Sequence, residues 1–368
     1  MRIHHQPYHT IWLSEAHKVQ VIDQRLLPHR FEVKQLADTS SVVTAIADMV
    51  VRGAPLIGVT AAFGMYLASK EALQNNDPKA YLQLAAQQLR SARPTAVNLA
   101  WAVDQLESIL MKLPPASWPE RALELAEQLK ADDIGYSEAM GENGLPLIEA
   151  LTQQHPNRAI NILTHCNAGW LATIDWGTAT APIYKAHRKG IPVHVWVDET
   201  RPRNQGASLT AFELGQEGVP HTVIADNTGG HLMQHGMVDL VIVGTDRTTA
   251  TGDVANKIGT YLKALAAFDN QVPFYVAAPS SSIDFQLQDG LSEIPIETRD
   301  ANEVKWIQGW DGDRLTKVLL TPEDSPAVNY GFDVTPARLV TGLITERGIC
   351  TASEAGLRGL FPERFPND

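Results

Sequence analysis

The composition of this chain narrows its class before any motif is considered. It has 368 residues, of which 44% are hydrophobic and 20% charged, as in a folded globular protein large enough for two domains. The formal net charge of -12 and a pI near 5.5 disfavour an extended nucleic-acid-binding surface but leave room for a local basic pocket that binds a small phosphate.

Cysteine content and the N-terminus indicate the compartment. Two cysteines, Cys166 and Cys350, are too few for a disulfide framework and fit a reducing environment. The start MRIHHQPYHTIW lacks the charged beginning and long apolar core of a signal peptide, and no apolar run is long enough to span a bilayer. We therefore expect a cytoplasmic protein that has no membrane partner.

Residues 1–130 are predicted to form a mainly helical domain that opens with short strands. Residues 10–36 alternate as a few small strands do. Helices are predicted over about 42–51 after a cap at Thr39 or Ser40, from Pro55 onward, over about 79–89, over about 96–113 with a break at Pro94, and from 119 to about 151 with interruptions at Gly135, Gly141 and Gly144.

Residues 131–368 are predicted to form a Rossmann-like catalytic α/β domain. Strand and helix patterns alternate from residue 157, which is typical of βαβ units and a doubly wound parallel sheet. Helices are expected near 208–215, 231–236 and 254 onward, and a last one in TPARLVTGLITERG. Ligands of such sheets bind beyond the carboxyl ends of the strands. That edge would collect Cys166, the loop 198–205, Asp226, Asn227, Asp246 and Pro279 with its serines.

The stretch VDLVIVGTDRTTATGDVANKIGTY carries the most informative pattern. Its run LVIV reads as a strand buried on both faces, with Asp246 where the strand ends. Asp253 would cap a helix whose first turn contains Asn256 and Lys257, which would place a cation at a helix N-terminus suited to an anion. The alternative is that Asp246 only forms a solvated ion pair with Arg247 or Lys257.

Three other segments are candidate ligand contacts. Cys166, at a strand-to-helix turn, is a nucleophile, an acid or a base, or else a small buried residue. The loop DETRPRNQGASLTAFEL, which includes Gln205, is dense in groups that bind hydroxyls or phosphate, unless it is only a solvated loop. RGAPLIG offers Arg52 with the backbone of Gly53 and Ala54 before a helix, and Arg93 is a further candidate, although a surface role is the commoner fate of a single arginine.

Cofactor sites receive little support from the sequence. His231 and His235 have the spacing of two metal ligands on one helix face, but no third ligand is apparent, so we expect no metal. Neither the glycine-rich turn of dinucleotide-binding proteins nor a phosphate-binding P-loop is present, which disfavours a dehydrogenase or a nucleoside triphosphatase.

The motifs RGAPLIG, ARPTAVNL, THCNAG, DETRPRNQGASLTAFEL, GTDR, TGDVANKIGTY and FDVTPA occur in this order over nearly the whole chain. Together they closely resemble the methylthioribose-1-phosphate isomerase family of methionine salvage. The same superfamily contains ribose-1,5-bisphosphate isomerases and the regulatory alpha, beta and delta subunits of initiation factor 2B. The resemblance implies a homodimeric enzyme that acts on a sugar phosphate without a metal or nucleotide cofactor.

Carried over by motif, the resemblance implies specific roles. Cys166 and Asp246 would form the catalytic pair. The phosphate and sugar would contact Arg52, Gly53, Ala54, Arg93, Gln205, Asn256 and Lys257. A phosphate on C1 locks the sugar as a ring, so an acid must protonate the ring oxygen before a C2 ketone can form; Asp246 is the candidate acid, and proton transfer rather than hydride transfer is our hypothesis.

Two departures from the family pattern leave the substrate open. GTDRTTATGD replaces the more usual GADRI followed by Asn-Gly-Asp, and no Asn-Pro-Ala precedes FDVTPA. The substrate could be 5-methylthioribose 1-phosphate, 5-deoxyribose 1-phosphate or both, since one small group is worth only about 1–3 kcal/mol in a pocket. Ribose 1,5-bisphosphate would need a second phosphate site that the sequence does not reveal, and a non-catalytic regulatory protein would not need both Cys166 and Asp246.

Overall fold

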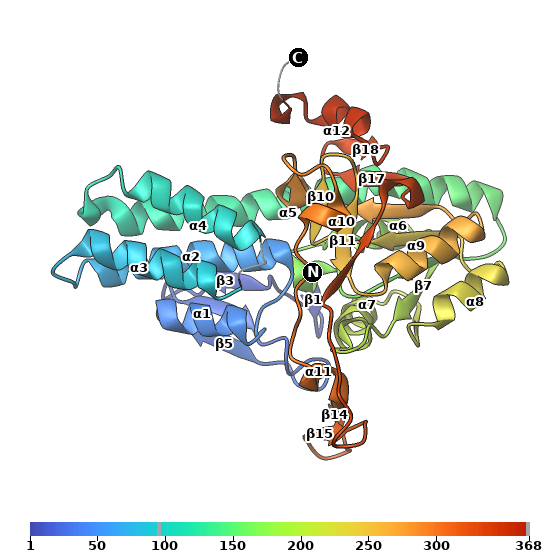
Figure 1. The fold of residues 1–368 in the computed structure, drawn as a ribbon, viewed down its shortest axis with the longest axis horizontal. Coiled ribbons are helices and arrows are strands. Elements are labelled where there is room, and N and C mark those ends of the chain that lie inside the picture. The colour runs from blue at the N-terminus through green and yellow to red at the C-terminus, as the bar shows by residue number, and fades with distance from the viewer. Residues whose placement is uncertain (94–96, 366–368) are drawn as a thin grey trace.

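A helical layer and a parallel sheet are the two main parts of the computed structural model, which describes residues 1–93 and 97–365 (Figure 1). The chain opens with a pair of two-residue strands, β1 (Arg2–Ile3) and β2 (Gln6–Pro7). A three-stranded antiparallel sheet follows, formed by β3 (Ile11–Leu13), β4 (Val19–Ile22) and β5 (Val33–Leu36). The predicted small strands are confirmed.

Five helices then pack around a shared apolar core. They are α1 (Thr39–Ala47), α2 (Ala54–Ala72), α3 (Pro78–Ser91), α4 (Val97–Leu110) and α5 (Trp118–Gln154). Helix α2 is buried along almost its whole length, which explains its richness in alanine and glycine. Helix α1 begins and ends earlier than predicted, because the side chain of Asp38 caps it by accepting from the N–H of Ser41 (2.7 Å). Pro94, the predicted break, lies outside the described residues.

Helix α5 corrects one prediction, because it is continuous and its glycines do not interrupt it. Gly141 and Gly144 lie against α6 (Ala181–Arg188), and a Cβ at Gly144 would stand 2.5 Å from the Cγ of Pro182. Glycine is thus used for close helix packing. Residue 130, the predicted domain boundary, lies within α5, and the division into 1–130 and 131–368 stays a prediction.

The large sheet has the order β18-β17-β12-β9-β6-β7-β8, and all neighbours except the β17–β18 pair are parallel. Without the edge strand β18, this is the 3-2-1-4-5-6 order of doubly wound sheets. Separate apolar cores cover the two faces, with α5 and α6 on one and α8 and α9 on the other. The predicted fold class is therefore confirmed. The strands are β6 (Ile160–Thr164), β7 (Val193–Asp198), β8 (His221–Ile224), β9 (Leu240–Val243), β12 (Phe274–Ala277), β17 (Gly342–Thr345) and β18 (Gly348–Cys350).

A second sheet at the carboxyl edge corrects the prediction of a helix from Val254. Its order is β13-β10-β11-β16, with β10 (Arg247–Thr249), β11 (Val254–Lys257), β13 (Ile283–Asp284) and β16 (Phe332–Thr335). Asn256 and Lys257 therefore lie on a strand, and the helix α9 (Thr260–Asp269) starts after Gly259. Asp253 does not cap that helix, because its carboxyl accepts from the N–H groups of Gly290 (3.0 Å) and Ala337 (2.9 Å).

The helix predicted in TPARLVTGLITERG is also wrong. Only a short 3-10 turn, Ala337–Leu339, forms there, and the apolar run that follows becomes β17. All four residues of β17 are buried, and a short buried apolar run cannot be assigned to helix or strand from its pattern alone.

The remaining elements surround the sheets. They are α7 (Ala211–Gln216), α8 (Thr228–Gln234), α10 (Gly290–Glu293), α11 (Asn302–Lys305), α12 (Glu354–Leu360) and a hairpin of β14 (Trp306–Trp310) and β15 (Leu315–Leu319). The hairpin projects from the body at the bottom of Figure 1. Among the described residues, every helix is either too short or too polar to cross a bilayer.

Candidate active site

A pocket lies at the topological switch point of the large sheet, where β6 and β9 are neighbours. Cys166 follows β6, and Asp246 follows β9. These segments are far apart in sequence, so the sheet order brings them together. All nine residues predicted from the sequence line this pocket: Arg52, Gly53, Ala54, Arg93, Cys166, Gln205, Asp246, Asn256 and Lys257.

Cys166 adopts a backbone conformation that is uncommon for a residue with a side chain. Its φ of 62° lies in the left-handed region. Its N–H donates to Oγ1 of Thr200 (2.8 Å), and its thiol donates to Oε1 of Gln205 (3.4 Å). The strained turn and these contacts hold a nearly buried sulfur at the pocket wall, which suits a reactive group better than a packing residue.

Asp246 has a carboxyl that the pocket walls shield from bulk water. Burial raises the pKa of Asp246, and the positive charge of Lys257 is the largest influence opposing that rise. Arg247, one of its expected ion-pair partners, binds Asp284 instead (2.7 Å). A carboxyl whose pKa is raised by burial can stay protonated nearer to neutral pH, as a general acid requires.

The N-terminus of α2 supplies backbone N–H groups to the pocket. Gly53 is the N-cap residue, with a φ of 90°, and a Cβ there would lie 2.4 Å from the carbonyl oxygen of Ala172. Only glycine fits this position. The first N–H groups of a helix lack intrahelical partners and lie at the positive end of its dipole. Gly53 and Ala54 thus provide the helix start that the predicted anion site at RGAPLIG requires, and the binding of an anion there stays a prediction.

Two cations line the same pocket. Lys257 stands at the end of β11, where its Nζ donates to the carbonyl oxygen of Gly331 (3.0 Å) and lies 4.7 Å from the ring centroid of Phe332. Burial lowers the pKa of Lys257 and of Arg93. The Nε of Arg93 is buried and has no hydrogen-bond partner among the described residues. An anionic ligand would satisfy both groups. Lys257 therefore lies in the pocket with the other predicted residues, although on a strand and not at the predicted helix start.

Two amides complete the predicted set. Gln205 is nearly buried and accepts from the thiol of Cys166. Asn256, also nearly buried, uses its Nδ2 to donate to Oγ1 of Thr260 (2.9 Å). Each amide offers both a donor and an acceptor, which suits the hydroxyl groups of a sugar.

Asn167 and Glu213 hold Arg52 in place and were missed from the sequence. Nη1 of Arg52 donates to Oδ1 of Asn167, whose Nδ2 in turn donates to Oε1 of Glu213. Glu213 also accepts from the N–H of Trp170 (2.7 Å), and a Cβ at Gly169 would lie 1.8 Å from its carboxyl. A single acid within the apolar start of a helix, as in TAFEL, is the signal that could have identified Glu213.

The buried carboxyl of Glu213 gives a stability prediction. Burial raises its pKa to about 8, so the folded state retains a proton that the unfolded chain loses near pH 4.5. Its contribution to the free energy of unfolding is present below about pH 4.5 and is lost as the pH rises through about 8. We expect Glu213→Gln to remove a decline of up to about 1.4 kcal/mol per pH unit in this window. Urea unfolding at several pH values measures it, with the exposed Glu124→Gln as the control. An unchanged slope in Glu213→Gln would contradict the prediction.

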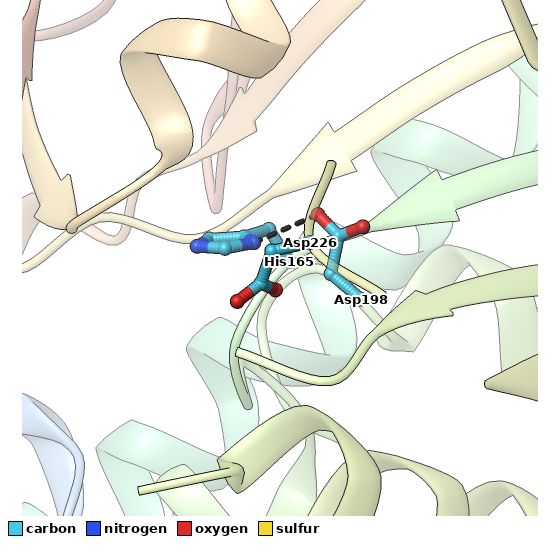
Figure 2. Close-up of side chains that lie close together, drawn as sticks. All are labelled: His165, Asp198 and Asp226. Carbon is cyan, nitrogen blue, oxygen red and sulfur yellow. Dashed lines mark hydrogen bonds and ion pairs between the residues drawn. The ribbon is translucent and has the colours of Figure 1, made fainter. Parts of the chain in front are cut away.

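A largely buried cluster that includes His165, the neighbour of Cys166, has the residue types of a metal centre. Donor atoms of His165, Asp198 and Asp226 lie within 4.8 Å of one another (Figure 2). Nδ1 of His165 contacts Asp198 Oδ2 and its Nε2 contacts the Ile258 carbonyl, each at 2.8 Å. Nζ of Lys263 stands 3.2 Å from Asp198 Oδ2, and backbone N–H groups bond both oxygens of Asp226. Apart from Oδ1 of Asp198, which is buried without a hydrogen-bond partner among the described residues, the donors are already used internally. A positively charged lysine among them also disfavours a second cation, so the cluster fits a network that fixes the loop after β6 rather than a metal site.

The histidine pair considered from the sequence lies elsewhere. His231 is on α8 and His235 directly follows it, and both side chains are exposed. Their rings stand 4.2 Å apart, and Nδ1 of His235 contacts the carbonyl oxygen of His231 (2.8 Å). Neither residue lines the pocket that contains Cys166 and Asp246.

Comparison with known proteins shows the family of the chain. Residues 50–352 match the Initiation factor 2 subunit family. The chain belongs to this family. Within the family it groups with the methylthioribose-1-phosphate isomerases: it is 59% identical over 368 residues to the methylthioribose-1-phosphate isomerase of Methylocella silvestris, with 99% of each chain covered.

Solved structures of family members share the architecture. The 5-methylthioribose 1-phosphate isomerase of Pyrococcus horikoshii OT3 is 36% identical with a TM-score of 0.83, covering 97% of both chains. The translation initiation factor eIF-2B subunit delta of A. fulgidus is 35% identical with a TM-score of 0.78, covering 97% of this chain and 99% of that one. The family fold thus occurs under both an enzyme name and an initiation factor name, and the site has to distinguish them.

Proposed function

We propose that this chain is an aldose–ketose isomerase that converts 5-methylthioribose 1-phosphate to 5-methylthioribulose 1-phosphate. The observation that carries the proposal is the placement of the thiol of Cys166 and the shielded carboxyl of Asp246 at the two strand ends of the switch point, beside an anion site. The name of the relative that is 59% identical supports the choice of substrate.

The pocket accounts for both ends of the reaction. The N–H groups of Gly53 and Ala54, with Arg52, Arg93 and Lys257, would bind the phosphate on C1, and Gln205 and Asn256 would hold sugar hydroxyls. Binding the phosphate in this way fixes C1 and C2 near the thiol and the ring oxygen near the carboxyl.

The proposed reaction conserves all protons. Asp246 gives a proton to the ring oxygen as the bond between C1 and that oxygen breaks. Cys166, as a thiolate, removes the hydrogen of C2 as a proton, and the freed electron pair forms the C1–C2 double bond of an enol. Cys166 then returns its proton to C1, while the hydroxyl on C2 gives its proton to the Asp246 carboxylate and becomes the ketone.

A non-catalytic regulatory role is the second candidate, because the initiation factor subunit from A. fulgidus shares the fold at 35% identity. A regulatory surface does not require a thiol in a left-handed turn and a shielded carboxyl in one pocket. If the chain is an enzyme but does not act on 5-methylthioribose 1-phosphate, the alternative substrate is ribose 1,5-bisphosphate.

The cellular setting belongs to the same proposal. We place the enzyme in methionine salvage, as a cytoplasmic homodimer without a metal or nucleotide cofactor. Two free cysteines among the described residues, Cys166 and Cys350, are compatible with a reducing compartment. Light scattering coupled to size-exclusion chromatography measures the oligomeric state, and a monomer would contradict the homodimer.

A direct assay tests the function. Purified protein is mixed with 5-methylthioribose 1-phosphate, and the C2 ketone is followed by carbon NMR, with a Cys166→Ser/Asp246→Asn double variant as the blank. We expect a ketone only with the wild type. If wild-type protein that circular dichroism shows to be folded forms no ketone, the substrate assignment is wrong. If a ketone forms only from ribose 1,5-bisphosphate, that sugar is the substrate instead.

A further inference from the structure

A small cavity with mostly apolar walls adjoins the pocket beside Asp246. The two spaces share Ala54, Arg93, Asp246 and Phe332 as wall residues. The cavity volume is about 40 Å³. A water needs about 10–15 Å³, so the cavity has room for about three heavy atoms. The walls that belong to the cavity but not to the pocket are Ile57, Val97, Arg247, Ala255, Ile294, Pro295 and Ile296.

The proposed chemistry of Asp246 determines which end of the sugar reaches this cavity. The ring oxygen that Asp246 protonates is bonded to C1 and to C4. The phosphate extends from C1 toward the anion site at Gly53, while C5 and its substituent extend from C4 on the other flank of the same oxygen. A sugar that presents its ring oxygen to Asp246 therefore directs its C5 substituent into the space beside Asp246 that the phosphate does not fill.

The lining of the cavity suits an uncharged group. Ile57, Ala255 and Ile294 are buried apolar residues from three different segments, and Ile296 is partly buried beside them. Of the two arginines, Arg247 is neutralised by Asp284, and Arg93 also lines the phosphate pocket. A phosphate on C5 would have five heavy atoms and would approach the carboxyl of Asp246, with the shared Arg93 as the remaining cation of the cavity wall.

We propose that this cavity, with Ile57, Ile294 and Ile296 as its apolar walls, binds the substituent on C5 of the sugar and selects a short thioether over a charged phosphate. The proposal rests on the function proposed above, and it names the residues that decide between 5-methylthioribose, 5-deoxyribose and ribose 1,5-bisphosphate substrates. A thioether that fills the cavity also keeps water away from Asp246.

Two variants at Ile296 test the proposal, because this side chain lines the cavity without being fully buried. We expect Ile296→Phe to narrow the cavity. The kcat/KM for 5-methylthioribose 1-phosphate should then fall about tenfold relative to the kcat/KM for 5-deoxyribose 1-phosphate, because the deoxy sugar places only a methyl group in the cavity. Ile296→Ala should enlarge the cavity and raise kcat/KM for 5-ethylthioribose 1-phosphate. A gain of activity cannot arise from misfolding. Ile349→Phe, at an exposed position of β18, is the matched control.

The outcomes separate this proposal from the proposed function. Suppose that the wild type converts 5-methylthioribose 1-phosphate, but neither Ile296 variant changes the ratios of kcat/KM among the 5-methylthio, 5-deoxy and 5-ethylthio sugars. The cavity then does not bind the C5 substituent, whereas the proposed isomerase function is retained. Efficient turnover of ribose 1,5-bisphosphate by the wild type would also contradict the proposal, because the cavity would then not exclude a charged phosphate on C5. If the wild type converts none of the 5-methylthio, 5-deoxy and 5-ethylthio sugar phosphates, the proposed function fails, and the cavity proposal fails with it.

Discussion

Asp246→Asn is expected to lower kcat by a factor of about 10²–10⁴, the range that general acid catalysis contributes. Asparagine keeps the size and polarity of the side chain but has no proton of suitable acidity to give to the ring oxygen. The phosphate contacts lie elsewhere in the pocket, so KM should change much less than kcat. Initial rates over a range of substrate concentrations measure both constants.

The pH dependence gives a second readout of the same carboxyl. Burial raises the pKa of Asp246, and an acid is active only in its protonated form. The kcat of the wild type should therefore fall as the pH rises through that pKa, and this limb of the profile should be missing from Asp246→Asn. Asp313→Asn, on the exposed turn between β14 and β15, controls for the change of one charge. Wild-type activity in Asp246→Asn, or the same falling limb, would exclude Asp246 as the acid.

Much of the fold could be predicted from local pattern because several buried parallel strands are short apolar runs with a polar residue close behind them. LVIV with Asp246 and NILT with Cys166 are examples, and their positions at β9 and β6 follow from the alternation of strand and helix. β11 and β17 were predicted as helices. Both are short, and each pairs on one side with a neighbour in sequence, β10 or β18, and on the other with a partner about 65 to 80 residues away, β16 or β12. The distant partners cannot be identified from local pattern.

Position in the pocket was predictable where a residue follows a strand end or begins a helix, as do Cys166, Asp246 and Gly53. Residues that act on other residues were missed. Asn167 and Glu213 matter because they hold Arg52, and the bond from Asn167 to Arg52 spans 115 residues of sequence. Such long-range polar contacts leave no periodic pattern. Lys257 was assigned to the site by a helix-start argument that the structure contradicts, since β11 carries it there instead.

Cys166→Ser is expected to reduce kcat by a factor of about 10²–10⁴, because serine holds its proton far more tightly than a thiol and cannot act as a base at neutral pH. The substitution keeps a hydroxyl that can donate to Gln205, so the loop should remain in place. Cys350→Ser is the matched control. Burial raises the pKa of Cys350 to about 11, and its thiol lies on β18 away from the pocket.

Turnover in deuterated water tests how hydrogen moves between C2 and C1. If the thiol carries it as a proton, wild-type turnover in deuterated water should place deuterium on C1 of the ketose, because the thiol can exchange the proton taken from C2 with solvent while the enol is bound. Proton NMR of the product measures this incorporation. Deuterium on C1 would exclude a hydride shift. A product without deuterium would count against an exchangeable proton, and it would fit either a hydride shift or a proton that the thiol shields from solvent. Full activity of Cys166→Ser would remove Cys166 from the reaction altogether, and the proposed proton path would then need another base within reach of C2.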